Sequence, residues 1–228
     1  MNVAIIAAAG QGTRIGGKRA KQFLELAGAP IIFHTLKPFE RCDAIHEITL
    51  VLPAEEVAGF LELTPKFALR KLTRVVAGGA TRAESVLRGL QAIPSTNVEV
   101  VAVHDGVRPF VTADEISRTV ETAHIFGAAI LVASVVDTIK KVGSDRVLGS
   151  LKRSDLRRAL TPQCFRYSLL CRAYETVDLN EADLTDDSLL VERIGAQVAI
   201  VEGSSRNIKI TQPEDLLLAE ELMEEKWS

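Results

Sequence analysis

Small residues followed by spaced cations open the chain. After the apolar run Val3–Ala8 come Ala9 and Gly10, and the basic residues Arg14 and Lys21 follow. Glycine adopts backbone conformations closed to other residues, and successive backbone N–H groups in such a loop can form a concavity that binds anions. Cationic side chains beside that concavity would lie against phosphate groups. The segment predicts a nucleotide-triphosphate loop, although a glycine-rich turn with solvated basic residues is the alternative.

This loop matches neither of two common nucleotide-binding motifs. The GxxxxGK[ST] pattern of the P-loop is absent, and the glycines lack the GxGxxG spacing of dinucleotide-binding folds, with no acidic residue in the ribose position. The chain also has no Ser–His–Asp order, no HExxH and no cysteine–histidine metal spacing. Its four histidines are scattered, so we expect no histidine-based metal site.

Two further clusters follow expected strands. In AGGATRAES, Gly79 and Ser85 accompany a pair of glycines that lets a flat group approach, and a helix N-terminus supplies exposed N–H groups. A plain strand-to-helix turn explains this segment equally well. In VHDGVRP, Asp105 suits a cation or hydroxyl and Arg108 suits a phosphate, unless the two form a local ion pair. We expect the preceding His104 to be hydrogen-bonded and semi-buried, with no catalytic role.

A fourth group of polar residues is dispersed along the second half of the chain. Its members are Thr138, Arg153, Thr161, Thr185 and Lys209. Each one taken singly is most simply a surface residue, because loops are normally polar. Only their combination with the other clusters indicates a site.

The elements that must position these residues alternate along the chain. Strands are expected at 3–8, 47–52, 73–77, 98–104, 128–136 and 197–201. Several are continuously apolar, as in strands covered on both faces. Capping-box patterns at 81–84 and 112–115 start helices, and a last helix runs from Pro213 to about Glu225. This alternation predicts an α/β fold whose mostly parallel sheet carries helices on both faces.

Residues 137–152, DTIKKVGSDRVLGSLK, depart from that rhythm. Gly143-Ser144-Asp145 stands between two short, polar, β-prone runs, which predicts a hairpin around a turn. A protruding hairpin exposes unpaired strand edges unless something covers them. We therefore expect this arm to form the interface of a homodimer.

Composition limits the class of protein. A length of 228 residues is typical of one domain, here 1–228, and 47% hydrophobic with 25% charged residues is ordinary for a globular protein. The net charge of −3 argues against a nucleic-acid partner. There is no signal peptide and no long apolar run, and the three cysteines give no disulfide framework. These features predict a cytoplasmic protein without a membrane partner.

Eight motifs in order resemble one known family. They are AAAGQGTR, KQF, VVAGGATRAESV, VHDGVRPF, DTIK, LTPQ, TDDS and VEGSSRNIKITQPEDL, spread from Ile5 to about Ala219. This set closely resembles the 2-C-methyl-D-erythritol 4-phosphate cytidylyltransferases of the non-mevalonate isoprenoid pathway. The resemblance implies a nucleotidyltransferase-like, Rossmann-like fold, CTP as co-substrate with Mg²⁺ or another divalent cation, and a homodimer whose arm reaches the neighbouring active site. The implied reaction transfers a cytidylyl group from CTP to methylerythritol phosphate and releases pyrophosphate.

The same resemblance implies a role for each matching residue. Arg14 and Lys21 would stabilise the transition state, and Arg153 and Lys209 would position the attacking phosphate. The nucleotide would contact Ala8, Ala9, Gly10, Gly79, Ser85 and Gly106. The sugar phosphate would contact Asp105, Arg108, Thr138, Arg153, Thr161, Thr185 and Lys209. Thr138 and Arg153 would come from the partner subunit, and Asp105 is a tentative metal ligand.

Two alternatives remain open at this point. A ribitol-5-phosphate cytidylyltransferase shares DGVRPF-like and NIKIT-like segments, whereas the ALTPQ run and Thr185-Asp186-Asp187 favour methylerythritol phosphate. A non-catalytic nucleotide-binding regulator would use the same fold, but Arg14, Lys21 and Lys209 favour an enzyme. Small departures from the family pattern are Ala20, Ala80 and Gly106. We expect no fused downstream domain, since the chain ends soon after its last expected helix.

Overall fold

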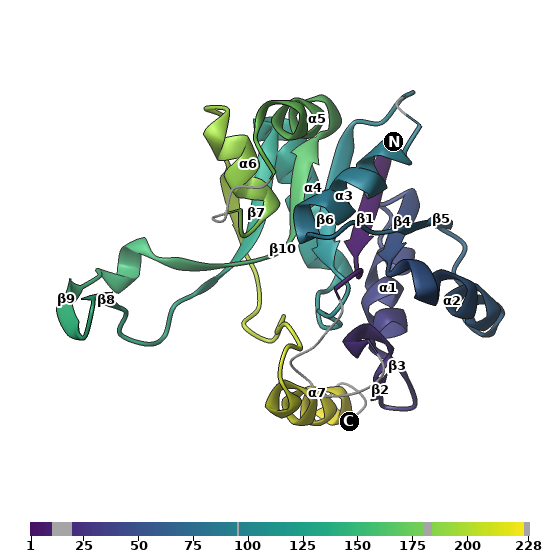
Figure 1. The fold of residues 1–228 in the computed structure, drawn as a ribbon, viewed down its shortest axis with the longest axis horizontal. Helices are drawn as coiled ribbons and strands as arrows, with labels where there is room; N and C mark the ends of the chain where they lie inside the picture. Colours follow the sequence, from purple (N-terminus) through teal and green to yellow (C-terminus); the bar gives the residue numbers. More distant parts are fainter. Residues whose placement is uncertain (11–19, 95, 180–183, 226–228) are drawn as a thin grey trace.

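Seven strands form the central sheet of the structure, a computed structural model that describes residues 1–10, 20–94, 96–179 and 184–225 (Figure 1). Their spatial order is β11-β7-β10-β6-β1-β4-β5. The bounds are β1 (Asn2–Ala7), β4 (Glu47–Leu52), β5 (Leu72–Ala77), β6 (Val100–Asp105), β7 (Ala128–Ser134), β10 (Arg157–Arg166) and β11 (Ala199–Glu202). All six expected strands are present, with ends shifted by one or two residues in most of them.

The sheet is mostly parallel, as expected. Strand β1 pairs in parallel with both β4 and β6, β4 with β5, and β11 with β7. Because β4 and β5 extend the sheet on one side of β1 while β6 returns to the other, the chain changes direction at β1. In open α/β sheets, ligands bind outside the carboxyl ends of the strands at such a switch point.

Strand β10 was not expected, and it is the antiparallel strand of this sheet. It lies between β6 and β7 and pairs antiparallel with both. Its sequence contains Pro162, which normally argues against an internal strand. The register with β7 shifts between Ala159 and Gln163, so the proline lies at an irregularity where no regular ladder bond is required. This irregularity contains Thr161, one of the predicted site residues.

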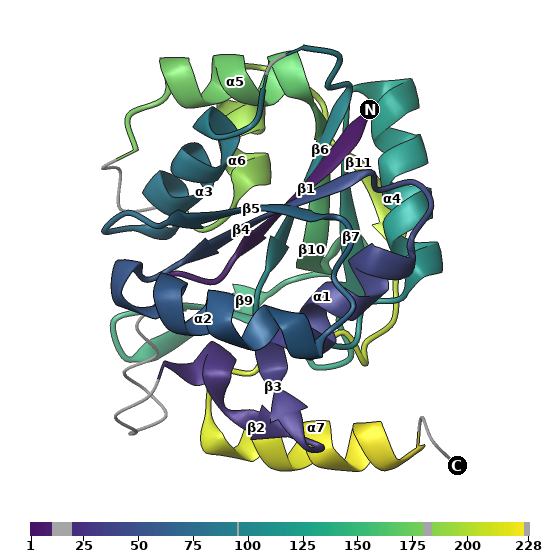
Figure 2. The same ribbon diagram turned by 90° about the vertical axis from the view of Figure 1, so that its right-hand side faces the viewer.

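Helices cover both faces of the sheet (Figure 2). One face carries α1 (Ile31–Arg41), α2 (Val57–Leu63) and α4 (Ala113–Phe126), and the other carries α3 (Arg82–Gln91), α5 (Tyr167–Thr176) and α6 (Asp187–Arg193). Alternate residues of β1 serve the two cores: Ala4 and Ile6 join the first, Val3 and Ile5 the second. Continuous apolar strands are the consequence of this double coverage.

The expected helix starts are present. Thr112 and Glu115 form a complete capping box at α4. At α3, the Thr81 side chain accepts from the Glu84 N–H, but the Glu84 carboxylate turns to the Ala80 N–H instead. The last helix, α7 (Pro213–Glu225), begins at the expected proline.

Helix α7 crosses below the carboxyl ends of the strands (Figures 1 and 2), and a third apolar cluster includes its buried side chains. It joins Ala219 and Met223 of α7 to Val107 and to Leu26 of the short strand β2. Strands β2 (Glu25–Leu26) and β3 (Ala29–Pro30) form a small hairpin beside the turn η2 (Lys21–Phe23). The remaining turns are η3 (Ala54–Glu56), η4 (Thr64–Lys66) and η5 (Arg153–Asp155). The cluster anchors the segments that carry Lys21 and Lys209 beside the sheet.

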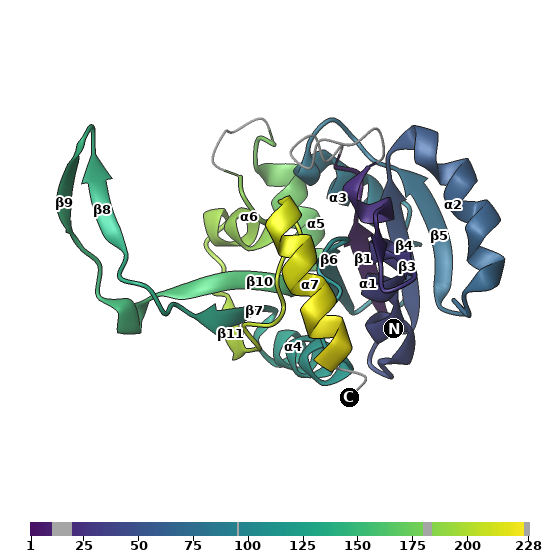
Figure 3. The ribbon, with the colours of Figure 1, turned by 90° about the horizontal axis from the view of Figure 1, so that it is seen from below.

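The expected hairpin is present and extends away from the sheet (Figures 1 and 3). Strands β8 (Lys140–Gly143) and β9 (Arg146–Ser150) pair antiparallel. The side chains of Val142, Val147 and Leu148 are 66%, 62% and 64% exposed, so this arm has apolar surface that the described chain does not cover. Its role in dimer formation remains a prediction.

The helices of the described ranges were also compared with the length and apolarity that a bilayer requires. None of them is both long and apolar enough to cross a membrane.

Helix α3 packs on the sheet through Gly89, and we expect Gly89→Ala to destabilise the fold. A Cβ there would lie 2.8 Å from Cγ2 of Ile5 and 3.0 Å from Cγ2 of Val51, both buried and branched. Overpacking of this kind costs about 1–3 kcal/mol, which outweighs a gain in helix propensity of up to about 1 kcal/mol. Urea denaturation measures the change in unfolding free energy.

Gly59 is the matched control, because a Cβ on this exposed helical glycine meets no described atom within 4 Å. We expect Gly59→Ala to stabilise the protein slightly through helix propensity alone. A Gly89→Ala variant as stable as the Gly59→Ala variant would contradict the packing described for α3.

Candidate active site

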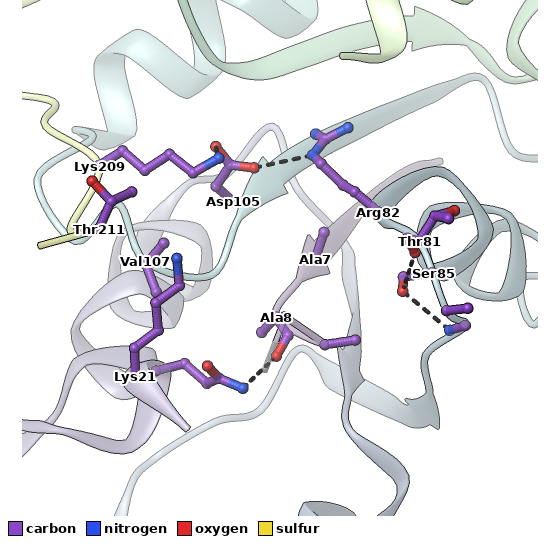
Figure 4. A pocket seen from close by; sticks show the side chains of 15 residues that line it. Ala7, Ala8, Lys21, Thr81, Arg82, Ser85, Asp105, Val107, Lys209 and Thr211 are labelled. Atoms are coloured by element: carbon purple, nitrogen blue, oxygen red, sulfur yellow. Dashed lines mark hydrogen bonds and ion pairs between the residues drawn. The ribbon is translucent and has the colours of Figure 1, made fainter. Parts of the chain in front are cut away.

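The carboxyl ends of β1, β5 and β6 open into one pocket of about 590 Å³ (Figure 4). The turn η2 and the loop before α7 complete its walls. The pocket is lined by Ala7, Ala8, Ala9, Gly10, Lys21, Gln22, Gly79, Ala80, Thr81, Arg82, Ser85, Asp105, Val107, Lys209 and Thr211. Three of the four clusters noted in the sequence therefore meet at the position where an α/β sheet binds its ligand.

The loop that follows β1 is held from several sides. The Ala8 N–H donates to the Val51 carbonyl at 2.9 Å, and the Gln22 side-chain amide donates to the Ala8 carbonyl at 2.6 Å. Gly106 lies directly behind this loop, and a Cβ on it would collide with the Cβ of Ala8. Gly106 is thus buried and supports the loop, whereas Ala8, Ala9 and Gly10 face the pocket.

The turn after β5 is fixed by its own hydrogen bonds. The Gly79 N–H donates to Oγ of Ser85 at 3.1 Å, and this hydroxyl donates to the Thr81 carbonyl at 2.8 Å. Gly79 and Ser85 both line the pocket, as predicted. Because the hydroxyl hydrogen of Ser85 is already used, its remaining lone pair can only accept a hydrogen bond from a ligand.

Three cations surround the Asp105 carboxylate. Nε of Arg82 lies 3.2 Å from Oδ1, while Nε of Arg108 and Nζ of Lys209 lie 3.0 and 3.1 Å from Oδ2. The side chain of Asp105 is only 8% exposed. Burial alone would raise the pKa of this carboxyl, but the charges of Arg82, Lys209 and Arg108 outweigh burial and hold the pKa well below its ordinary range. Asp105 is therefore a carboxylate whose charge organises one side of the pocket.

Arg82 is a charged residue of the site that the sequence analysis missed. Its Nη1 also contacts Oδ2 of Asp187 at 2.8 Å, and Asp187 is almost completely buried. Asp187 in turn accepts from the Tyr174 hydroxyl at 2.6 Å. Arg82 stands in the segment VVAGGATRAESV, but the sequence indicates only a helix start there. No local pattern shows that both carboxylate partners come from distant segments.

Other predicted site residues do not line this pocket. Arg14 lies outside the described residues. Arg108 and Thr161 are behind Asp105, where Arg108 donates to Asp105 and the Asp105 N–H donates to Oγ1 of Thr161 at 3.2 Å. The suggested local ion pair between Asp105 and Arg108 is thus present. Thr138, Arg153 and Thr185 are exposed and absent from the pocket lining of this chain.

The described residues do not fit a divalent cation held by the protein. Among them, no group of three or more His, Cys, Asp or Glu side chains could ligate a metal. Asp105 is the one acidic residue that lines the pocket in the described ranges, and both its oxygens contact cations. A metal ion there would have to displace these cations or be repelled by them. The tentative assignment of Asp105 as a metal ligand therefore has no support in this geometry.

Sequence comparison gives relatives over nearly the whole chain. The profile of the family described as 2-C-methyl-D-erythritol 4-phosphate cytidylyltransferase matches residues 2–225. The enzyme of that name from Geobacter metallireducens is 43% identical over 226 residues, which are 98% of this chain and 97% of the relative. The enzyme of that name from Bacillus velezensis is 46% identical over 222 residues, which are 97% and 95% of the two chains.

Solved structures give the same result. A 4-diphosphocytidyl-2C-methyl-D-erythritol synthase from Anaerococcus prevotii has a TM-score of 0.86 at 31% identity, covering 98% of this chain and 96% of its own. The 2-C-methyl-D-erythritol 4-phosphate cytidylyltransferase from Thermus thermophilus has a TM-score of 0.78 at 33% identity, covering 97% and 98%. The fold, the motifs and these relatives agree, and the chain belongs to the 2-C-methyl-D-erythritol 4-phosphate cytidylyltransferase family.

Proposed function

We propose that this chain catalyses the reaction for which its family is named, in isoprenoid precursor biosynthesis. It transfers the cytidylyl group of CTP to 2-C-methyl-D-erythritol 4-phosphate, giving 4-diphosphocytidyl-2-C-methyl-D-erythritol and pyrophosphate. The observation that carries the proposal is a pocket with cations on one side and a tightly held small-residue loop on the other. Such a pocket suits two phosphate-bearing substrates bound next to each other.

The chemistry requires orientation and charge stabilisation more than proton transfer. An oxygen of the 4-phosphate forms a bond to the α-phosphorus of CTP, and the bond from that phosphorus to the pyrophosphate oxygen breaks. Since the nucleophile is already an anion, no general base is needed. Orientation can contribute on the order of 7–11 kcal/mol, and each cation aimed at the developing charge about 3–4 kcal/mol.

Lys21 and Arg14 are the residues that we assign to the charge of the transferring phosphoryl group. Lys21 lines the pocket next to the loop of Ala8, Ala9 and Gly10, which we assign to the triphosphate. The hydrogen bond from Gln22 to the Ala8 carbonyl supports this assignment, because it couples η2 to that loop at 2.6 Å. In this proposal the loop backbone and Lys21 would contact the same side of the nucleotide.

Gly79, Ser85 and Gly106 complete the proposed nucleotide site. The one hydrogen-bonding capacity left on Oγ of Ser85 is that of an acceptor. Cytosine carries an exocyclic amino group, which is a donor. We assign Ser85 to that amino group, and Gly79 to the flat face of the base. Gly106 supports the ribose side from beneath Ala8.

The sugar phosphate is assigned to the cationic side of the pocket. Asp105, Arg108 and Lys209 form one charge cluster there, and Lys209 is the cation of this cluster that would position the attacking phosphate. Thr161 and Thr185 complete the site in this chain.

Thr138 and Arg153 are assigned to the site of a second copy, as parts of a homodimer. Both lie near the arm of β8 and β9, and Arg153 Nη1 donates to the Val136 carbonyl at 2.7 Å beside it. Neither residue lines the pocket of its own chain. The exposed apolar side chains of the arm support its burial against another subunit.

A divalent cation, Mg²⁺ in particular, would enter with the nucleotide. Mg²⁺ commonly keeps several waters and few protein ligands, and the described pocket residues do not fit a protein-held ion. The phosphates of CTP would supply its ligands. A reducing, cytoplasmic location is supported by the three cysteines, all of which are free.

Lys21→Ala tests the function and the role of Lys21 together. We expect the wild-type chain to release pyrophosphate from CTP with methylerythritol phosphate and not with ribitol 5-phosphate. We expect Lys21→Ala to lower kcat about 100- to 1,000-fold, with a much smaller change in KM for CTP, because the cation acts on transition-state charge. Lys66→Ala, an exposed lysine on η4, is the control. An unchanged kcat with a raised KM for CTP would defeat the assignment.

Asp105→Asn tests whether this carboxylate holds a metal. Replacing the charge leaves Arg82, Arg108 and Lys209 without their shared anion, so we expect lower thermal stability and lower kcat/KM for the sugar phosphate. Loss of one partner of a buried pair costs about 3–5 kcal/mol, and partial exposure of the cations reduces this figure. The Mg²⁺ concentration giving half-maximal activity should stay unchanged. Recovery of Asp105→Asn activity at raised Mg²⁺ would show instead that Asp105 binds the metal.

Subunit mixing tests the contribution from the second copy. A mixed dimer of a Lys21→Ala chain and an Arg153→Ala chain would have one active site with both residues intact. We expect such dimers to regain up to about half of wild-type activity, since one of two symmetric sites is restored. Dimers with Lys21→Ala on both chains are the control and should stay inactive. No recovery in verified mixed dimers would place Arg153 outside the neighbouring site.

A further inference from the structure

His104 is a buried polar residue that the proposed mechanism does not use. It lies in β6 directly before Asp105, and none of its surface is exposed. The ring packs against Phe39, with ring centroids 4.9 Å apart. Burial lowers the pKa of His104 to about 4, so the imidazole is neutral near pH 7. A neutral imidazole has one donor nitrogen and one acceptor nitrogen, and the surroundings decide which is which.

The neighbours of His104 determine its tautomer. Nε2 lies 3.1 Å from the Arg108 carbonyl oxygen. Since a carbonyl oxygen can only accept, the proton of the imidazole must be on Nε2. Nδ1 is then an acceptor, and the Oγ1 of Thr161 at 2.9 Å must donate to it. The same oxygen accepts the Asp105 N–H at 3.2 Å.

These contacts belong to a closed ring in which each residue donates to the next. Nε2 of His104 donates to the Arg108 carbonyl, and Nη1 of Arg108 donates to the Asn207 carbonyl at 2.9 Å. Nδ2 of Asn207 donates to the Thr161 carbonyl at 2.8 Å, and the Thr161 hydroxyl donates back to His104. The ring joins the end of β6, the following loop, β10 and the segment that carries Lys209. The cycle therefore ties these four segments to one another.

The Thr161 hydroxyl links His104 to the main chain at Asp105. Its one hydrogen is committed to His104, and one of its two lone pairs accepts from the Asp105 N–H. Thr161 is 4% exposed and does not line the pocket, whereas Asp105 does. A change at His104 therefore reaches the pocket through Asp105.

We propose that His104 is a positioning residue whose neutral, Nε2-protonated ring fixes the Thr161 hydroxyl and the main chain at Arg108, and so holds Asp105 and Arg108 in the charge cluster beside the pocket. This rests on the proposed function for the assignment of that cluster to the sugar phosphate. His104 itself touches no reacting atom. Its effect passes through Thr161, Arg108 and Asn207.

The tautomer is tested by ¹⁵N NMR of histidine-labelled, wild-type protein at pH 7.5. The chain has four histidines, and the signal absent from the His104→Gln variant belongs to His104. We expect one pyrrole-like nitrogen, Nε2, and one pyridine-like nitrogen, Nδ1. Thr161→Val should shift the Nδ1 signal of His104, because this substitution removes the donor. A proton on Nδ1, or on both nitrogens, would overturn the proposal.

Two substitutions separate the roles of the two imidazole nitrogens of His104. The amide of Gln can reach the Nε2 position and still donate to Arg108, but it leaves Thr161 without an acceptor. The amide oxygen of Asn can replace Nδ1 and still accept from Thr161, but it leaves the Arg108 carbonyl without a donor. For His104→Gln and His104→Asn we expect kcat/KM for the sugar phosphate to fall about tenfold or more, with KM for CTP changed less than about twofold. Thermal unfolding of each variant checks that the fold is retained.

His124→Gln is the matched control, since His124 is a partly exposed histidine on α4, and we expect its kinetics to match the wild type. Equal losses toward CTP and the sugar phosphate, or no loss at all, would contradict a positioning role for His104. If the wild-type protein fails to transfer the cytidylyl group, the proposed function is wrong. The NMR experiment does not depend on that activity and still tests the tautomer of His104.

Discussion

The charge of one nearly buried carboxylate, Asp105, holds three cations together at the edge of the pocket. Arg82 begins α3, Arg108 belongs to the loop after β6, and Lys209 precedes α7, so three separate segments converge on it. Three cations in one small volume repel each other, and a buried ion is stable only when it is paired. Because the pKa of Asp105 is held far below its ordinary range, the negative charge persists at every physiological pH. Asp105 therefore keeps the three cations assembled.

The apolar core explains why Asp105 stands where it does. Strand β6 is buried along its whole length and pairs with β1 on one side and β10 on the other. Asp105 is the last residue of β6 and lies opposite Ala7, the last residue of β1, so its side chain emerges beside the loop after β1. The close approach of Gly106 to Ala8 then brings the cationic side and the small-residue side within one pocket. Core packing, and not local charge, determines the distance between the two halves of the site.

Patterns within short segments predicted a large part of this molecule. The alternation of apolar runs predicted six of the seven strands of the central sheet, and the capping box of Thr112 and Glu115 predicted the start of α4. The motif resemblance placed Lys21, Ser85, Asp105 and Lys209 in one site, and all four line one pocket. Strand β10 was missed because Pro162 interrupts its pattern, and it is tolerated at an irregularity that only the neighbouring strand reveals. The same irregularity presents Thr161 to His104.

The sequence by itself determined the fold class, the family and the side chains that carry charge, because these depend on residue types at fixed spacing along the chain. Tertiary structure alone decided which side chains pair with one another. Arg82 could have been a solvated helix-start cation. Its pairing with both Asp105 and Asp187 follows from the packing of α3 on β1, β4 and β5, which brings the first residue of α3 beside the end of β6 and the start of α6. Likewise, His104 has the expected hydrogen bonds but is wholly buried rather than semi-buried, with its tautomer dictated by the Arg108 carbonyl and the Thr161 hydroxyl. The physical reason is the separation along the chain over which each effect acts. Periodicity and capping act over a few residues, whereas charge pairing and burial depend on which distant segments the core brings together.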